Sequence, residues 1–294
     1  MNENEITDKR TIKEFKGITF SKYKKSDAKK ELLNNLSSGK IEPACYWAAE
    51  FICAGHYADI WEIIIFFCSK HIHLGNPKLP IYLDLRLDHF KQILHNGYQE
   101  NIIKMRNSDK IRKLFGEIIS VLCLSKKKHT IDNIKIGKDD FNITKITYKL
   151  KADSTRYASI IFKKEDPSEL FVGINEFYWN ILKEQKNGAL ACWWLEWILG
   201  FEDICKKENK KYSAARRSNM PVEGSYQKDV IWMIWECLLM EANNRSKGMH
   251  KIVTAMLSIF CLRYKPGVRK RRKYLIYFAI NLLTEPLDNS IPII

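Results

Sequence analysis

Apolar residues recur every three or four positions through most of the chain, which is the spacing of one face of an α-helix. The clearest series is Leu79, Leu83, Leu87, Phe90 and Leu94. A helix with such a face is stable in water only when that face packs against other elements. We therefore predict a mainly α protein with two blocks, each of about five helices.

Capping residues, prolines and glycines mark where the predicted helices begin and end. Ser26-Asp27 and Gly39 bound the first helix, and Glu42-Pro43 and Gly55 bound the second. In the N-terminal block the predicted helices cover about 26–39, 42–55, 57–72, 79–97 and 108–124. In the C-terminal block they cover about 166–188, 189–205, 226–243, 247–263 and 268–284.

The segment 129–165 is instead rich in β-branched and aromatic residues. Its three runs, Ile134–Ile136, Ile143–Lys149 and Tyr157–Phe162, are separated by turn-forming residues. We predict that they form a small β-ribbon joining the two helical blocks. The predicted domains are a flexible basic tail at 1–25, a helical block at 26–128, the β-ribbon at 129–165 and a second helical block at 166–294.

Two pairs of segments resemble each other in the same order along the chain. Ala44–Ile52 resembles Ala191–Ile198 once a one-residue gap is allowed, and Ile60–Ile65 resembles Ile234–Leu239. Either the two blocks arose by tandem duplication, or tryptophan and cysteine are core residues that make short apolar helices look alike. Both interpretations stay open at the level of sequence.

The charge balance favours an anionic partner. The chain has 49 Lys and Arg against 34 Asp and Glu, a formal charge of +15. Such an excess attracts nucleic acid or acidic proteins without specifying a fold. A lysine-, isoleucine- and asparagine-rich composition also follows from an AT-biased genome, so part of the excess charge needs no functional explanation.

Cysteine usage and hydropathy indicate an intracellular protein. The eight cysteines are spread singly, mostly within apolar runs, in a chain long enough to fold without disulfides. The longest apolar run, Ile60–Cys68, is shorter than the roughly 20 residues that cross a bilayer. We expect reduced core thiols, no membrane span, and a location in the cytoplasm or nucleus.

Residue types that ligate metals occur together in the N-terminal block, but their spacing is unfavourable. Cys53 and His56 are three positions apart, and Cys68, His71 and His73 follow within one segment. A zinc site needs about four such groups converging tetrahedrally, usually from turns rather than apolar helices. We therefore predict core cysteines and helix-end histidines, with no bound metal and no cofactor.

No catalytic signature is present. The chain has no phosphate-binding GxxxxGK[ST] loop, no GxGxxG after a strand and no GxSxG elbow. Glu50 and Glu196 lie among aromatic residues, and Asp84 and Asp88 are four positions apart on one predicted helix. A structural hydrogen bond explains the former pair more simply than acid-base chemistry, and a solvated helix face explains the latter. We predict a protein that is not an enzyme.

Basic residues interleaved with aromatic residues and amides are the strongest functional signal. They fall in a predicted flexible loop and at the start of the last predicted helix, beside Lys265. The predicted nucleic-acid-binding residues are Lys206, Lys207, Lys210, Lys211, Tyr212, Arg216, Arg217, Arg269, Lys270, Arg271, Arg272 and Lys273. A solvated charge run, or a nuclear-import signal at Lys270–Lys273, is the alternative.

The position of the second cluster adds to this signal. Positive charge at a helix N-terminus opposes the helix macrodipole, by a few tenths of a kcal/mol per charge. A cluster such as Arg269–Lys273 at the start of a helix is thus locally unfavourable, which suggests that an anionic partner accounts for it.

Four short motifs in the stretch from Glu42 to Leu94 carry a resemblance to other proteins. They are Trp47–Glu50, Gly55-His56, Asp59–Glu62 and Lys70–Leu79. This stretch resembles helical proteins of nucleocytoplasmic large DNA viruses, and the segment Lys270–Ile280 is similar to them in character. The resemblance covers only part of the chain and transfers no catalytic residue. It implies a viral protein acting in DNA replication, transcription or virion assembly.

Together these observations predict a non-enzymatic helical protein that binds nucleic acid, with DNA preferred over RNA, as a viral replication or transcription accessory factor. The alternative is a protein-interaction or virion structural component whose positive surface packs against other viral proteins or the enclosed genome. The expected location is the cytoplasm or nucleus of an infected host cell, or the virion.

Overall fold

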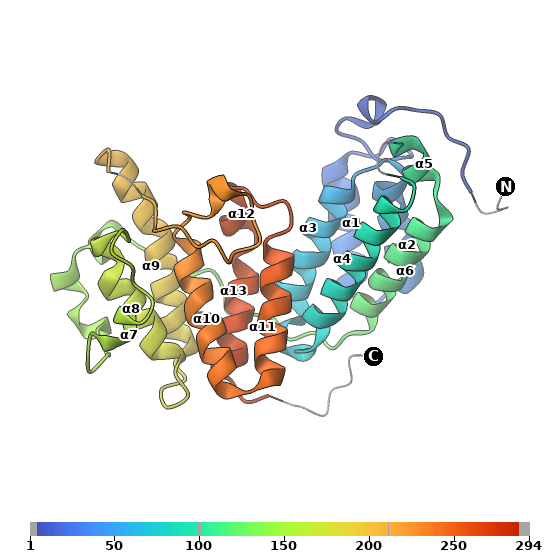
Figure 1. Cartoon of the computed structure of the whole chain (residues 1–294). Helices are drawn as coiled ribbons and strands as arrows, with labels where there is room; N and C mark the ends of the chain where they lie inside the picture. The colour runs from blue at the N-terminus through green and yellow to red at the C-terminus, as the bar shows by residue number, and fades with distance from the viewer. Residues whose placement is uncertain (1–4, 99–100, 211, 288–294) are drawn as a thin grey trace. The chain divides into compact units, whose positions relative to one another are not determined.

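The computed structural model describes residues 5–98, 101–210 and 212–287, which fall into two compact units. Unit 1 lies within residues 1–129 and unit 2 within residues 130–289 (Figure 1). The described residues contain 13 α-helices and no β-strand. The prediction of a mainly α protein is therefore confirmed.

Unit 1 is a helical bundle built around one central helix. Its helices are α1 (Lys25–Ser37), α2 (Ile41–Cys53), α3 (Tyr57–Phe67), α4 (Leu79–His95), α5 (Ile102–Asn107) and α6 (Asp109–Leu124). Helix α6 contacts α1, α2, α3 and α4. Its apolar stripe, which includes Ile111, Phe115 and Ile118, is fully buried, as expected for a helix surrounded by others.

The buried side chain of Arg106 holds the segment before α1 against the helices of unit 1. Arg106, at the end of α5, donates to the carbonyl oxygens of Cys53 and Arg10 and to the carboxylate of Asp8, at 2.7–2.9 Å. Its guanidinium also lies 4.6 Å from the ring centre of buried Phe15. The segment predicted as a flexible tail thus has defined contacts from Asp8 onward.

Unit 2 is also organised around a central helix. After α7 (Arg156–Ser159) its helices are α8 (Phe171–Ile181), α9 (Gly188–Lys207), α10 (Ile231–Arg245), α11 (Lys247–Phe260), α12 (Pro266–Arg271) and α13 (Lys273–Thr284). Helix α13 contacts α8, α9, α10, α11 and α12. Every residue from Tyr274 to Thr284 is buried, so this helix forms the centre of the core.

The predicted β-ribbon at 129–165 is wrong. The segment forms short 3₁₀ turns at Lys138–Phe141, Ile143–Lys145 and Thr147–Lys149, and then α7. Its backbone groups bond to side chains of α8 and α9 rather than to a partner strand. Glu176 accepts from the backbone N–H groups of Lys151 and Ala152, and Trp197 donates to the carbonyl oxygen of Asp140.

Several helices also differ from those predicted. The helix predicted at 166–188 covers only Phe171–Ile181, and the helix predicted at 226–243 begins at Ile231. The helix predicted at 57–72 ends at Phe67 and continues as a π-helical turn, Cys68–Ile72. The helix predicted at 268–284 is two helices that meet at Arg272, and the short helix α5 had no predicted counterpart. Within the described part of the chain, no helix combines the length and apolar character needed to cross a bilayer.

The structure does not support a duplication of the two blocks. The matched segments fall on α2 and α9, but their aromatic residues have different environments. Tyr46 is 47% exposed and Trp47 is partly exposed, whereas the matched Trp193 is buried and Trp194 is 0% exposed. Similar sequences therefore form part of the surface of unit 1 and part of the core of unit 2.

The π-helical turn of unit 1 brings two histidines together. The Nδ1 atoms of His71 and His129 are 3.2 Å apart, and the His71 ring stacks on Phe67 with ring centres 5.1 Å apart. Burial, helped by the positive charges of His129 and Lys70, lowers the pKa of His71 to about 4. His71 is therefore neutral at physiological pH.

This shift predicts a pH dependence of stability. Between about pH 6.5 and pH 4 the unfolded chain binds a proton at His71 that the folded chain does not, so the free energy of unfolding falls as the pH falls through this window. His71→Phe should flatten the dependence, measured as thermal unfolding at several pH values. His89→Phe, at an exposed position of α4, is the control and should leave the dependence unchanged; equal slopes for both variants would contradict the assignment.

Candidate nucleic-acid interface

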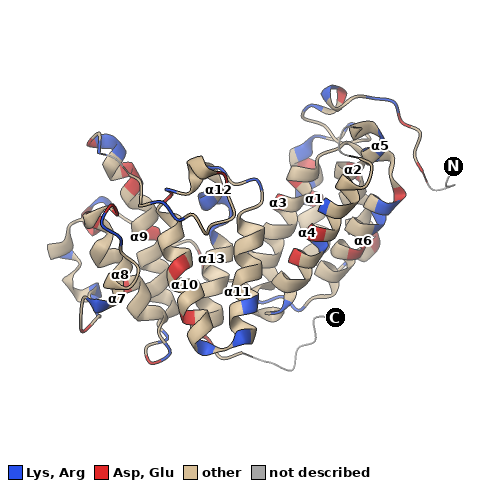
Figure 2. Cartoon of the chain, in the orientation of Figure 1, with Lys and Arg blue, Asp and Glu red and all other residues tan. Residues whose placement is uncertain are grey.

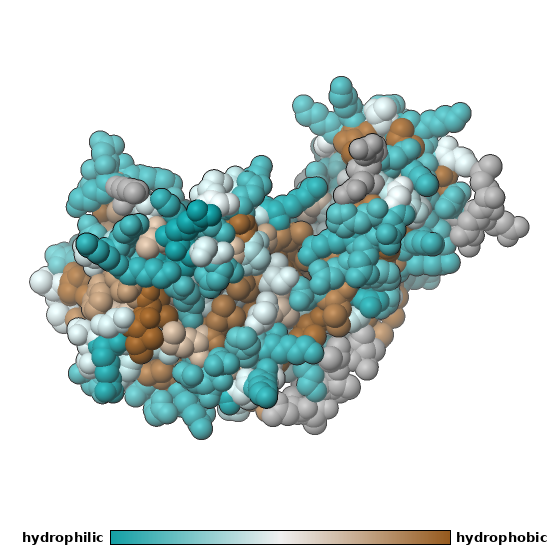
Figure 3. Space-filling model, viewed as in Figure 1, coloured by the Kyte–Doolittle hydropathy of each residue, from teal (hydrophilic) through white to brown (hydrophobic). Residues whose placement is uncertain are grey.

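The two predicted basic segments lie at the same end of unit 2. This end holds the C-terminus of α9, the loop from Glu208 to Val230, helix α12 and the start of α13. Figure 2 shows blue segments at the tip of α9, in this loop and on α12. Figure 3 shows hydrophilic side chains gathered over the same elements. Residues about 60 positions apart in sequence thus share one region.

Arg269 of α12 is the residue that joins these elements. Its guanidinium is 5% exposed and donates to both carboxylate oxygens of Asp229, at 2.8 and 2.7 Å. It also pairs with Glu202 of α9. Burial alone would lower the pKa of Arg269, but Asp229 and Glu202 raise it above its usual value, so the group stays charged.

Arg217 fixes the middle of the loop in the same way. It is 0% exposed and forms a bidentate pair with Asp166, with one N–O distance of 2.7 Å, and a 3.0 Å bond to Glu236 of α10. The remaining N–H groups donate to the carbonyl oxygens of Ala215 and Ile161. Although burial opposes it, the pair with Arg217 lowers the pKa of Asp166.

Arg272 lies in the bend between α12 and α13 and is 4% exposed. It donates to the carbonyl oxygens of Phe260 and Leu262, both at 2.8 Å, at the C-terminal end of α11. A cation at this position satisfies carbonyl groups that have no partner within the helix. Arg272 is therefore a helix cap.

Arg217, Arg269 and Arg272 must accordingly be removed from the predicted contact surface, because their guanidinium groups face the interior. The macrodipole argument also needs correction. Arg269–Arg271 form the last turn of α12 rather than the start of a long helix, and positive charge is favourable at a helix C-terminus. This cluster is not evidence for an anionic partner by that route.

Two other predicted contacts are partly buried. The Tyr212 hydroxyl donates to the carbonyl oxygen of Ile198 at 2.5 Å, and its ring centre lies 5.8 Å from the guanidinium of Arg269. Burial raises the pKa of Tyr212 well above its usual value. Lys273 donates to Glu196 at 2.8 Å. Lys211 lies outside the described residues.

The remaining predicted residues are exposed, and several have acidic neighbours. Lys206 lies 2.9 Å from Glu202, and Lys210 lies 2.7 Å from Glu208. Lys228 and Arg263 are also exposed in this region but were not predicted. We call the set of exposed cations the basic end: Lys206, Lys207, Lys210, Arg216, Lys228, Arg263, Lys265, Lys270 and Arg271.

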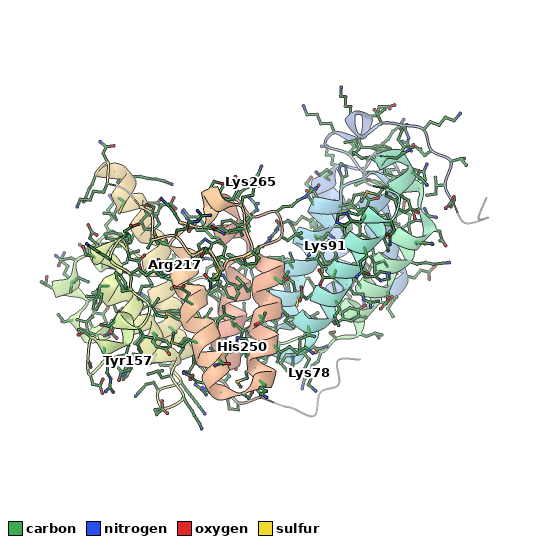
Figure 4. The ribbon with its side chains drawn as sticks, viewed as in Figure 1. Lys78, Lys91, Tyr157, Arg217, His250 and Lys265 are labelled. Carbon is green, nitrogen blue, oxygen red and sulfur yellow. The ribbon has the colours of Figure 1, made fainter. Side chains whose placement is uncertain are left out.

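Part of the basic end is concave. A surface pocket of about 690 Å³ beside α12 has Arg263 and Lys265 on its wall, together with Tyr264 and Glu223. Figure 4 shows Lys265 at this end of unit 2 and His250 toward the other end. A pocket with two cations and an aromatic residue can hold a phosphate group, with Glu223 limiting how many negative charges it accepts.

The candidate catalytic carboxylates are bound to other side chains, and the candidate metal ligands do not converge on one point. Glu50 is 5% exposed and accepts from Thr19 Oγ1 at 2.7 Å and from Ser21 Oγ at 2.6 Å. Asp88 pairs with Lys91 at 2.9 Å. No cluster of three or more His, Cys, Asp or Glu side chains among the described residues could hold a metal ion.

No protein-family model, curated protein or solved structure matches this chain.

Arg217 and Arg216 are adjacent in sequence, but substitutions at the two positions should change the free energy of unfolding by different amounts. Arg217→Met leaves Asp166 buried without its cation, and should lower the free energy of unfolding by about 3–5 kcal/mol. Arg216→Met removes an exposed arginine that donates to Gln227, and should change it by less than about 1 kcal/mol. Urea denaturation followed by circular dichroism measures both. Similar values for the two variants would show that Arg217 has no special structural role.

Proposed function

We propose that this chain is a non-enzymatic nucleic-acid-binding protein whose basic end contacts the phosphate backbone. DNA is the expected ligand. The resemblance to proteins of nucleocytoplasmic large DNA viruses supports a role as an accessory factor in viral replication or transcription. The main observation behind this proposal is that exposed cations from α9, the 208–230 loop and α12 lie at one end of unit 2.

The buried arginines strengthen this surface indirectly. Arg269 engages Asp229 and Glu202, and Arg217 engages Asp166 and Glu236. The two guanidinium groups carry a charge of +2 against −4 for the four carboxylates, so they offset half of the negative charge at this end of unit 2. The exposed cations then attract approaching anions with less repulsion from the carboxylates of this region.

The chemistry of this surface favours backbone contacts over sequence recognition. Six of its nine members are lysines, whose compact charge neutralises phosphates without the planar fork that arginine uses to recognise guanine. Such contacts release counterions, so affinity should fall steeply with salt. Helix α12 carries Lys270 and Arg271 of the basic end, but it has 6 residues, which is short for a helix that reads bases in the major groove.

The mixed charge of the basic end favours a second candidate, a protein-interaction or virion structural component. Lys206, Lys210 and Lys270 each lie within 4 Å of a carboxylate, as in polar protein interfaces. Mass spectrometry of purified particles against infected-cell extract separates the roles. High copy in particles with no free pool indicates a structural component, and a free pool indicates an accessory factor.

A matched pair of triple variants tests the proposed surface. Lys207, Lys265 and Lys270 changed to Ser should weaken binding to a duplex of about 20 base pairs by at least tenfold at low salt. The slope of log K against log salt should fall by up to about 0.9 for each phosphate that the variant no longer neutralises. Fluorescence anisotropy at several salt concentrations measures both quantities.

The control removes the same charge from the other end of unit 2. Lys183, Lys247 and Lys251 are exposed near the C-terminus of α8 and the start of α11. Arg245, at the end of α10, donates to the carbonyl oxygen of Ile181, which places these helix ends together. Ser at these three positions should reduce affinity much less. Equal reductions in both variants, or no binding by the unchanged protein, would refute the proposed surface.

A further inference from the structure

Unit 1 carries a cluster of exposed aromatic side chains that its core does not require. Tyr23, Tyr46 and Trp47 form a contiguous group, with ring centres 5.1 Å apart for Tyr23 and Trp47 and 5.3 Å apart for Tyr46 and Trp47. Tyr23 is 44% and Tyr46 is 47% exposed. Large aromatic side chains are usually more deeply buried, so a cluster of this kind marks an interaction surface.

The turn that carries Tyr23 is held rigidly on α2. The buried carboxylate of Glu50 accepts from the Thr19 hydroxyl at 2.7 Å and from the backbone N–H of Ser21 at 2.8 Å. The Thr19 N–H donates to the carbonyl oxygen of Tyr23 at 2.9 Å, which closes the turn. Lys22 has a φ of 70° within it. The aromatic cluster is therefore preorganised before any ligand binds.

Both tyrosine rings pack on Trp47. The neighbouring Tyr23 hydroxyl, followed by burial, raises the pKa of Tyr46. Trp47 thus restrains both rings, and the hydrogen-bonded turn fixes the backbone next to Tyr23. Restrained rings lose little conformational entropy on binding a flat ligand.

Two exposed lysines lie next to the aromatic cluster. Lys22 and Lys24 are exposed on either side of Tyr23 in sequence. The carboxylate of Glu50 is buried beneath the turn, where it accepts hydrogen bonds from Thr19 and Ser21. Lysine is depleted at the core of protein interfaces, so lysines bracketing an aromatic residue fit a protein partner poorly. Aromatic faces beside cations fit a ligand that combines flat bases with phosphates.

We propose that Tyr23, Tyr46 and Trp47 form a stacking surface for unpaired bases, with Lys22 and Lys24 holding the adjacent phosphates. This inference rests on the proposed nucleic-acid binding and specifies single-stranded segments as the ligand of unit 1. Bases in a duplex are stacked on each other and cannot present their faces to a side chain. The surface therefore distinguishes single strands from duplexes.

Glu42 places a negative charge close to the aromatic cluster. It is exposed on α2 one helical turn before Tyr46, where residues four apart are neighbours. Its carboxylate repels a phosphate that approaches the cluster. Glu42→Gln should therefore bind single strands about twofold or more tightly than the unchanged protein.

The direct test uses the full chain and an oligothymidylate of about 20 nucleotides. The double variant Tyr23→Ala, Tyr46→Ala should bind it at least about tenfold more weakly, while binding to a duplex stays within about twofold. The double variant Tyr23→Phe, Tyr46→Phe keeps both rings and should bind within about threefold of the unchanged protein. Tyr148→Ala, at a 63% exposed position in unit 2, is the matched control and should have no effect.

The outcomes separate this inference from the proposed function. Loss of single-strand binding in the Ala variant, with the Phe variant and circular dichroism unchanged, supports the stacking surface. Unchanged single-strand binding in the Ala variant overturns it and leaves the basic end of unit 2 unaffected. Loss in the Ala variant, together with no effect of the triple lysine variant of unit 2, overturns the basic end as the contact surface and supports the stacking surface. No binding of any oligonucleotide by the unchanged protein overturns both.

Discussion

The arrangement of unit 2 depends on arginine side chains that are charged and buried. Arg269 joins α9, α12 and Asp229, which lies two residues before α10, and Arg217 joins the loop to Asp166 and Glu236. A buried ion pair gains little over an apolar contact, but breaking one side of it leaves an uncompensated charge. The loop between α9 and α10 has little regular structure, so these pairs set its path. The exposed lysines take their positions from that path.

Helix positions could be predicted because their signal is local. The apolar spacing of Leu79–Leu94 lies within α4, and Gly39 and Gly55, with positive φ angles, follow the C-caps of α1 and α2. Ser26-Asp27, predicted as the cap of the first helix, instead lies in the first turn of α1, which begins at Lys25. The β-ribbon failed because its competing contacts are distant. Glu176 is 25 positions from Lys151, and Trp197 is 57 positions from Asp140. Residues with high β-propensity instead packed against α8 and α9, as Phe141 does on Trp197.

The two basic segments could be recognised in the sequence, but which of their cations are exposed could not be deduced from charge alone. The acidic partner of Arg217 is 51 positions away, and that of Arg269 is 40 positions away. One local signal was present. Val268, Arg269 and Arg272 recur at three- and four-residue spacing and are buried, whereas Lys270 and Arg271 between them are exposed. A cation on an apolar stripe indicates a buried pair, and periodicity applies to charged residues as well as apolar ones.

The aromatic surface of unit 1 could not be predicted from the sequence either. The resemblance between Ala44–Ile52 and Ala191–Ile198 suggested one structural role for both segments. In α9, the neighbouring helices α8 and α13 cover the tryptophans, whereas α2 has the turn at Thr19–Tyr23 over part of its face. That turn is fixed by Glu50 and ends before it covers Tyr46. Exposure therefore depends on what packs against a helix, which its own residues do not encode. A segment whose aromatic residues match a core helix becomes a ligand surface where its neighbour is a short, lysine-bearing turn.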